Sequence, residues 1–309
     1  MESRIEQEAE VPETARNARR AGTPTARRLH PSVVIFCLLL VCLSAPAQGP
    51  PSNTVVVTSA ASYKDQVAPD SLATVFGSNL APGMAHAGLD PSGNLPRQLV
   101  GTSVEVNGRP CGLVFVSPTQ INFHVPRETD LGTAQVLVRR DGLGLVGQGV
   151  VPLRNSVPAL FSLDGSGQGR GAVINAVTSK LDPFDVSTPE NPGADKRTRL
   201  SLFATGLRFA GNPARAPEVT NVAAFVRVEG RDSAGRMWSL AVEYAGAAPG
   251  FFGLDQVNVV VPGELQGAGT VALTVTAETF ASNAVTCTIR GLQEGIEVLS
   301  FSGNSHYRN

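Results

Sequence analysis

The sequence is poor in several residue types on which enzymes and nucleic-acid-binding proteins depend. Its 309 residues include four histidines, four cysteines, three methionines and one tryptophan, and aromatic residues make up 6%. The 25 lysines and arginines nearly balance the 26 acidic residues, which leaves a net charge of −1. Such a balance provides no excess of basic groups to neutralise phosphates, so we predict no nucleic-acid partner.

Motifs for catalysis are also missing. The sequence has no G-x-S-x-G elbow, no C-x-x-C pair and no Cys/His cluster at metal-ligand spacing. We expect His86, His124 and His306 to face solvent, in a loop, on a strand and in the tail. A strand-like segment follows the glycine-rich stretch 164–171, which therefore predicts a turn and not a phosphate loop. We predict no enzyme activity, no cofactor and no bound metal.

A long apolar run occurs only near the N-terminus. Residues 33–43 are apolar, Arg27 and Arg28 precede them, and Ala-Pro-Ala ends at Ala47. A basic flank, a short apolar core and a small-x-small site are typical of a secretory signal peptide, and the run is too short to span a bilayer. Residues 1–47 are thus predicted to be a signal peptide with a long n-region. The mature protein would be secreted, periplasmic or on the cell surface, with no transmembrane span.

The sequence repeats a distinctive pattern. "TQINFHVP" at 119–126 returns as "DQVNVVVP" at 255–262, and the strand-like segments around each copy follow in the same order. Self-similarity of this kind indicates duplicated structural units. We predict one domain over 54–154, a Gly/Pro-rich connector over 155–197 that packs on a domain, a second domain over 198–290 and a tail over 291–309.

Alternation of apolar and polar residues predicts strands throughout both units. Val104 and Val106 alternate with polar residues before Asn107-Gly108, a dipeptide that favours a two-residue hairpin turn. Half-apolar strands suit antiparallel sheets with one buried face. The predicted fold is all-β, with two tandem immunoglobulin-like antiparallel β-sandwiches after the signal peptide.

The repeated amides suggest two interpretations. Gln120 and Asn122 share one face of the first strand, and Gln256 and Asn258 share the equivalent face of the second. Their side chains both donate and accept hydrogen bonds, so they would pin each strand and its loop to a neighbour, or would grip a ligand such as a sugar. We favour the first interpretation, since a pairing that occurs in both units reflects shared architecture.

Few aromatic residues remain as a candidate sugar platform. These are Trp238, Tyr244, Phe251 and Phe252, of which Trp238 is the main binding candidate. We expect all four to fill the core instead.

The mature chain keeps two cysteines, one in each unit. Cys111 and Cys287 both lie in strand-like apolar segments, where buried free thiols are common. Free thiols are the favoured prediction, and a bridge between the units is the alternative.

Several of these segments together resemble a known family. "SAASYKDQVAPDSLATVFGSNLAP", "VEVNGRPCGLVFVSPTQINFHVP", "LFATGL" and "YAGAAPGFFGLDQVNVVVP" are similar to the duplicated C-terminal domain of secreted acidobacterial proteins, the Solibacter-type uncharacterised family. The resemblance covers about residues 54–290 and implies an exported, non-catalytic bacterial module with IPT/TIG-like immunoglobulin-like halves. It implies no site residues.

Together these observations favour a secreted or cell-surface module that contacts an extracellular protein or polysaccharide. One alternative is a passive spacer or envelope-attachment unit. Another is the accessory domain of an extracellular hydrolase.

Overall fold

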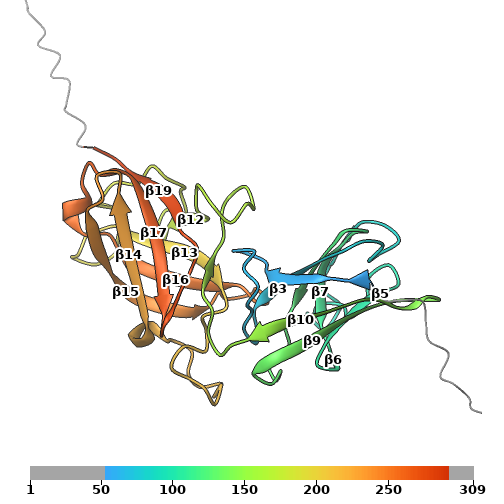
Figure 1. Cartoon of the computed structure of the whole chain (residues 1–309). Coiled ribbons are helices and arrows are strands. Elements are labelled where there is room, and N and C mark those ends of the chain that lie inside the picture. The colour runs from blue at the N-terminus through green and yellow to red at the C-terminus, as the bar shows by residue number, and fades with distance from the viewer. Residues whose placement is uncertain (1–52, 292–309) are drawn as a thin grey trace, which may run out of the picture. The chain divides into compact units, whose positions relative to one another are not determined.

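Strands form where apolar and polar residues alternate. A computed structural model describes residues 53–291, and its alternating segments form extended strands (Figure 1). These strands bury every second side chain. Strand β8 (Gln120–His124) buries Ile121 and Phe123 in this way, and strand β16 (Asp255–Val260) buries Val257 and Val259. The predicted all-β, antiparallel fold class is confirmed.

The N-terminal half, residues 53–154, consists of two five-stranded sheets. Their strand orders are β1-β10-β9-β5-β6 and β2-β3-β8-β7-β4. Neighbouring strands pair antiparallel except for β1, which runs parallel to β10. The other strands here are β1 (Asn53–Thr54), β2 (Val56–Ser59), β3 (Leu72–Phe76), β4 (Ala85–His86), β5 (Thr102–Val106), β6 (Arg109–Pro110), β7 (Gly112–Val116), β9 (Gly132–Arg140) and β10 (Gly144–Leu153).

The C-terminal half, residues 155–291, has one nine-stranded sheet in the order β11-β13-β16-β15-β14-β17-β18. Strand β12 pairs with β13, and β19 with β17. Strand β15 connects the two parts of this sheet, because its first residues pair with β14 and its last residues pair with β16. Its elements besides β16 are β11 (Ala159–Leu160), β12 (Val173–Asn175), β13 (Arg199–Thr205), η1 (Ala223–Phe225), β14 (Val226–Asp232), β15 (Met237–Ala247), η2 (Gly263–Leu265), β17 (Gly269–Ala277), β18 (Phe280–Ala281) and β19 (Val285–Ile289).

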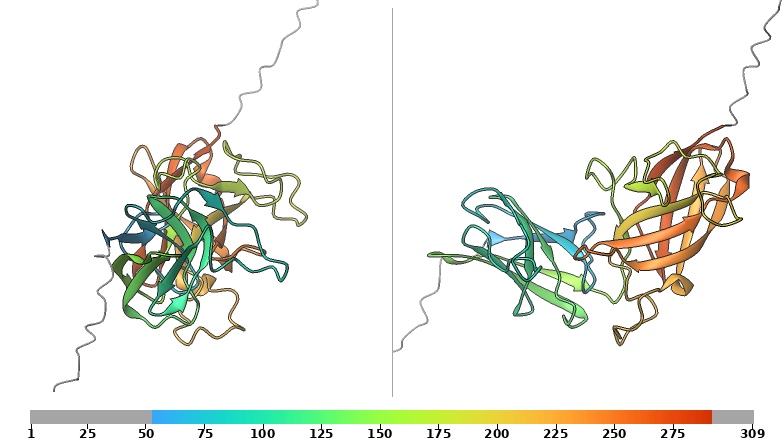
Figure 2. Two further views of the ribbon diagram at one scale, coloured as in Figure 1. Left: turned by 90° about the vertical axis from the view of Figure 1, so that its right-hand side faces the viewer. Right: turned by 180° about the vertical axis from the view of Figure 1, so that it is seen from behind.

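Each half has its own hydrophobic core. The first is built mainly from valines of both N-terminal sheets, and the second mainly from the inner faces of β11 to β19. The right-hand view of Figure 2 shows the two groups of strands around separate interiors. Cys111 lies in the first core and Cys287 in the second, and both are free thiols, as the sequence favoured.

Local chemistry explains where several strands end. Asn107 and Gly108 have φ values of 48° and 73° and form the two-residue turn between β5 and β6, as predicted. The Asn107 side chain also accepts a 2.7 Å hydrogen bond from the amide of Gln135. Pro126 and Pro262 follow the ends of β8 and β16, since proline has no amide for the ladder.

The segment predicted as a connector contributes to the second sheet. Within 155–197, β11 and β12 both pair with β13, and Leu160, Val173 and Phe184 enter the second core. The predicted packing of this segment on a domain is therefore observed, in the form of added strands. The predicted signal peptide and nearly all of the predicted tail lie outside the described residues, and the domain bounds remain predictions.

Candidate functional site

The described residues belong to one compact unit, and its two halves are joined by hydrogen bonds between their strand ends. The amide of Leu72, at the start of β3, donates to Thr205 Oγ1 over 2.9 Å, and that hydroxyl donates to the carbonyl of Gly253 over 2.6 Å. Gly253 has a φ of 67°, and a Cβ at this position would lie 2.8 Å from the Leu72 side chain. Only glycine fits without strain where the backbone comes this close.

A cluster of charged side chains lies at the same junction. Arg208 Nε donates to Asp255 Oδ1 over 2.6 Å, and Arg208 Nη1 lies 3.0 Å from Asp70 Oδ2, so one guanidinium bridges carboxylates of both halves. Asp70 Oδ1 accepts a further 2.6 Å hydrogen bond from His124 Nε2. Asp255 is fully buried, and its other oxygen accepts the amide of Leu207 over 2.8 Å.

The electrostatics of this cluster follow from burial and from pairing. Burial alone would raise the pKa of Asp70, but the hydrogen bond from His124 and the charge of Arg208 outweigh it and hold that pKa below its ordinary value. Burial raises the pKa of Asp255, although Arg208 opposes the shift. Because these groups satisfy one another, the cluster is a structural clamp between the halves.

The position of His124 is a correction to the sequence analysis. We expected His124 to face solvent, but its side chain is only 16% exposed and contacts Asp70. Sequence alone gave no sign of this pair, because the two residues lie on different segments that only the fold brings together. His86 is exposed, as expected, and lies against Phe115 with 4.8 Å between ring centroids.

Backbone contacts add a second connection between the halves. The side chain of Arg127 donates to the carbonyl of Arg215, and the side chain of Arg215 donates back to the carbonyls of Arg127 and Thr129 over 2.6 and 2.9 Å. These bonds, with the charged clamp, limit independent movement of the halves.

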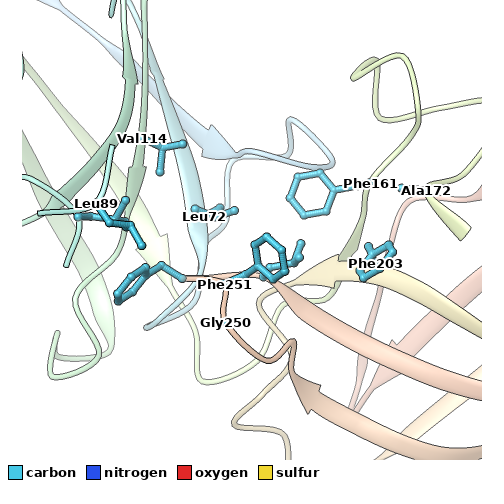
Figure 3. A pocket seen from close by; sticks show the side chains of 11 residues that line it. Leu72, Leu89, Val114, Phe161, Ala172, Phe203, Gly250 and Phe251 are labelled. Atoms are coloured by element: carbon cyan, nitrogen blue, oxygen red, sulfur yellow. The ribbon is translucent and has the colours of Figure 1, made fainter. Parts of the chain in front are cut away.

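Beside the clamp is a cavity of about 600 Å³, which we call the apolar cleft. Figure 3 shows its side chains. In the N-terminal half they come from β3, β7 and the loop between β4 and β5, and in the C-terminal half from β13, the β15–β16 turn and the residues next to β11 and β12. None of them carries a hydrogen-bonding group. The residues are Leu72, Leu89, Leu95, Val114, Phe161, Ala172, Phe203, Gly250, Phe251, Phe252 and Leu254.

The turn between β15 and β16 supplies the aromatic part of this cleft. Gly250 and Gly253 have φ values of 80° and 67°, which allow residues 248–254 to bend tightly around Phe251 and Phe252. Phe251 is 65% exposed and Phe252 is 38% exposed. The expectation that these two rings fill the core is therefore wrong, because the turn presents them at the surface.

A second cavity, of about 660 Å³, adjoins the apolar cleft and shares Leu95 and Phe252 with it. We call it the polar hollow. Half of its twelve lining residues are polar or charged, and three others are prolines. The residues are Asp90, Asn94, Leu95, Pro96, Arg97, Pro110, Gly112, His124, Pro126, Arg127, Glu128 and Phe252.

The four predicted amide residues form the same arrangement in both halves. Asn122 Oδ1 accepts hydrogen bonds from Gln120 Nε2 over 2.9 Å and from Thr74 Oγ1 over 3.0 Å. Thr74 lies on the neighbouring strand β3, so the amides cross-link two strands and part of their hydrogen-bonding capacity is used internally.

In the C-terminal half the residues correspond one by one. Asn258 Oδ1 accepts from Gln256 Nε2 over 2.8 Å and from Ser201 Oγ over 2.9 Å, which ties β16 to β13. The structure brings each Gln-Asn pair together. None of the four amide side chains lines the apolar cleft.

Trp238, the other predicted candidate, lies on β15 away from both cavities. It packs against the second core, and the Arg236 guanidinium lies 5.2 Å from its ring centroid. This placement agrees with a packing role.

Two features are absent from residues 53–291. No group of three or more His, Cys, Asp or Glu side chains is placed to hold a metal ion in this part of the chain. Nor does this part contain a helix with the length and hydrophobicity to cross a membrane.

No family model and no curated protein sequence matches the chain. Among solved structures, a mixed-linkage glucan utilization protein, SGBP-B of Bacteroides ovatus, has 10% identity and a TM-score of 0.28, over 73% of this chain and 43% of its own. A gamma-CGTase from alkalophilic Bacillus clarkii has 10% identity and a TM-score of 0.24, over 80% and 28%. Bovine butyrophilin has 11% identity and a TM-score of 0.21, over 78% and 96%. The chain spans less than half the length of the first two, and at these scores none of the three supports a functional argument.

Proposed function

We propose that the protein is a non-catalytic, exported binding module that contacts a partner protein through the apolar cleft. The observation that carries this proposal is the cleft itself, an apolar cavity of ligand-binding size with Phe251 largely exposed beside it. An exposed apolar patch of this kind marks an interaction site more often than it marks an ordinary surface. We also propose that the protein is exported and that it belongs to the Solibacter-type family.

The chemistry of the lining favours protein over polysaccharide. A sugar ring would stack on a phenylalanine face, but its hydroxyl groups would lose their water and find no hydrogen-bonding side chain in the cleft. An unpaired polar group that is buried costs about 1–3 kcal/mol. An aliphatic or aromatic side chain of a protein has no such cost.

The charged groups at the junction support a non-catalytic role. Asp70, His124 and Asp255 are all held by one another or by Arg208, in a cluster that is largely buried. A general base needs access to a substrate proton. Asp255 is fully buried, and His124, which lines the polar hollow, uses its Nε2 in the bond to Asp70.

A passive spacer or envelope-attachment unit is the second candidate. It is favoured by the clamp and the backbone contacts, which connect the halves without reference to any ligand.

Retention of a partner would test the proposal. Full-length protein would be immobilised and exposed to a solubilised cell-envelope fraction and, separately, to a panel of insoluble polysaccharides. We expect saturable retention of an envelope protein, lost after protease treatment of the fraction and weakened by Phe251→Ser. The matched control is Phe225→Ser, since Phe225 is also exposed but lines neither cavity.

Each other result has a defined meaning. Retention on a polysaccharide with Phe251 dependence would replace the protein partner by a glycan. No retention on any material would favour the spacer.

A further inference from the structure

The apolar cleft and the polar hollow share a wall. Phe252 and Leu95 line both cavities, so only these two side chains separate a ligand in the apolar cleft from the polar hollow. The ligand that matches both cavities therefore has an apolar group joined directly to polar groups.

We propose that these two cavities together bind an extended polypeptide segment of the partner. An aromatic or branched aliphatic side chain of the segment enters the apolar cleft, and the adjoining residues pass over Phe252 into the polar hollow. This inference rests on the proposed function and specifies the partner surface.

The cleft suits a single large anchor side chain. About two thirds of the surface of Phe251 is exposed, and Leu89, which lines the same cleft, is also exposed. An incoming apolar group would therefore remove both side chains from water. Burial of such surface in a pocket is typical of the few anchor residues that dominate protein interfaces.

The polar hollow distinguishes a polypeptide from a simple amphiphile. Arg97 and Glu128 are both exposed in it, and within residues 53–291 neither side chain has a hydrogen bond or an ion pair. Arg127 and His124 are engaged with Asp70, and the Asp90 carboxylate caps its own loop by accepting the amides of Ser92 and Asn94.

The hollow therefore presents one unpaired cation and one unpaired anion. A lipid or detergent whose headgroup carries a single charge would pair with one of these two groups and would be repelled by the other. A polypeptide provides backbone donors and acceptors together with side chains of either sign, which complements both groups. A glycan would complement the hollow but not the apolar cleft.

A selection from random peptides would test the inference. A phage-displayed library of linear 12-residue peptides would be panned on the full-length protein. The enriched sequences would then be synthesised with a fluorescein label, and their affinities measured by fluorescence anisotropy. We expect an aromatic or branched aliphatic residue next to a charged or polar residue to recur among them.

Variants of each cavity locate the site. Phe251→Ser should weaken binding about thirtyfold, the effect of losing a typical anchor contact, and Phe225→Ser should not weaken it. Arg97→Gln and Glu128→Gln should each weaken it about two- to fivefold, with a lower salt dependence, as expected for partly exposed charges. Thermal midpoints of all variants should match the parent, because the four side chains are exposed.

Three outcomes would overturn the inference, and only one of them also removes the proposed function. If no peptide is enriched but the apolar probe N-phenyl-1-naphthylamine or dodecanoate binds with Phe251 dependence, the cleft takes a small amphiphile and the binding module stands. If peptides bind only after residues 292–309 are deleted, the chain's own tail is the occupant. If neither peptide nor apolar probe binds the parent or the truncated chain, the cleft is not a binding site and both proposals are wrong.

Discussion

Replacement of Arg208 by methionine should show whether the charged clamp holds the two halves together. Methionine keeps most of the length and the apolar stem of the side chain but removes its charge and its donors. Arg208 is only 11% exposed, and its guanidinium contacts Asp255, Asp70 and the carbonyl of Leu254. The variant therefore leaves one fully buried carboxylate, Asp255, without the only ion pair that it has within residues 53–291.

The size of the effect follows from burial. Loss of one partner of a buried ion pair typically costs about 3–5 kcal/mol, because the remaining charge is left in a poorly solvated site. Asp255 keeps the Leu207 amide at 2.8 Å, and Asp70 keeps His124 at 2.6 Å. Since both carboxylates retain one donor, we expect the lower end of that range, about 3 kcal/mol in the free energy of unfolding at pH 7.

Urea-induced unfolding would measure this loss by circular dichroism. Arg290→Met is the matched control, because Arg290 pairs with Asp185 over 3.2 Å where both side chains are about half exposed. Exposed pairs of this kind contribute about 0–1 kcal/mol. A loss below about 1 kcal/mol in Arg208→Met, equal to that of the control, would refute the buried clamp.

A double variant separates the stranded charge from the lost contact. In Arg208→Met/Asp255→Asn the buried carboxylate is replaced by a neutral amide that still accepts from the Leu207 amide. The double variant should therefore be more stable than Arg208→Met alone, which gives a positive coupling energy in the double-mutant cycle. Additive losses would show that the two side chains do not interact.

Three further predictions address the rest of the structure. Asn122→Ala and Asn258→Ala should each lower the free energy of unfolding by about 1–3 kcal/mol in urea titrations, because each leaves buried donors without their acceptor; unchanged stability would reassign these amides to a ligand. The folded pKa of Asp70 lies below its ordinary value of 3.8, so the stability that its carboxylate contributes is complete above that pH and is lost as the pH falls through the folded pKa. The free energy of unfolding should therefore fall less steeply between pH 5 and pH 2 in Asp70→Asn than in the parent, and equal slopes would contradict the assignment. Burial raises the pKa of Cys287 to about 12 and raises that of Cys111 as well, so iodoacetamide at pH 8 should label neither thiol until urea is added, as read by peptide mass spectrometry, and labelling of the native protein would contradict their burial.

Local patterns in the sequence were sufficient for the strands and their faces. Alternation placed Val104 and Val106 inward, and the Asn107-Gly108 dipeptide fixed the turn that follows, because both effects depend on residues within one hairpin. The amide pairs could also be predicted, since the spacing of Gln120 and Asn122 places them on one face of a strand.

The contacts at the junction between the halves could not be predicted from local patterns. The clamp joins Asp70, His124, Arg208 and Asp255, which lie on four separate segments, and no spacing rule connects them. Composition alone also gave a wrong expectation for Phe251 and Phe252, because a pair of aromatic residues is typical of a core. Gly250 and Gly253 on either side of the pair were the signal for an exposed turn.

The two amide-bearing strands differ most in the turns that precede them. Residues 117–119 form a short turn closed on itself, in which the Ser117 hydroxyl donates to the Gln120 carbonyl over 3.1 Å and accepts the Gln120 amide over 2.9 Å. Residues 248–254 form a longer turn that carries Phe251 and Phe252 and reaches Leu72 through Gly253. The amide cross-links are the same in both halves and so explain strand pairing, which both halves need. The apolar cleft depends on the longer of these two turns, and a feature that strand pairing does not require is the better candidate for function.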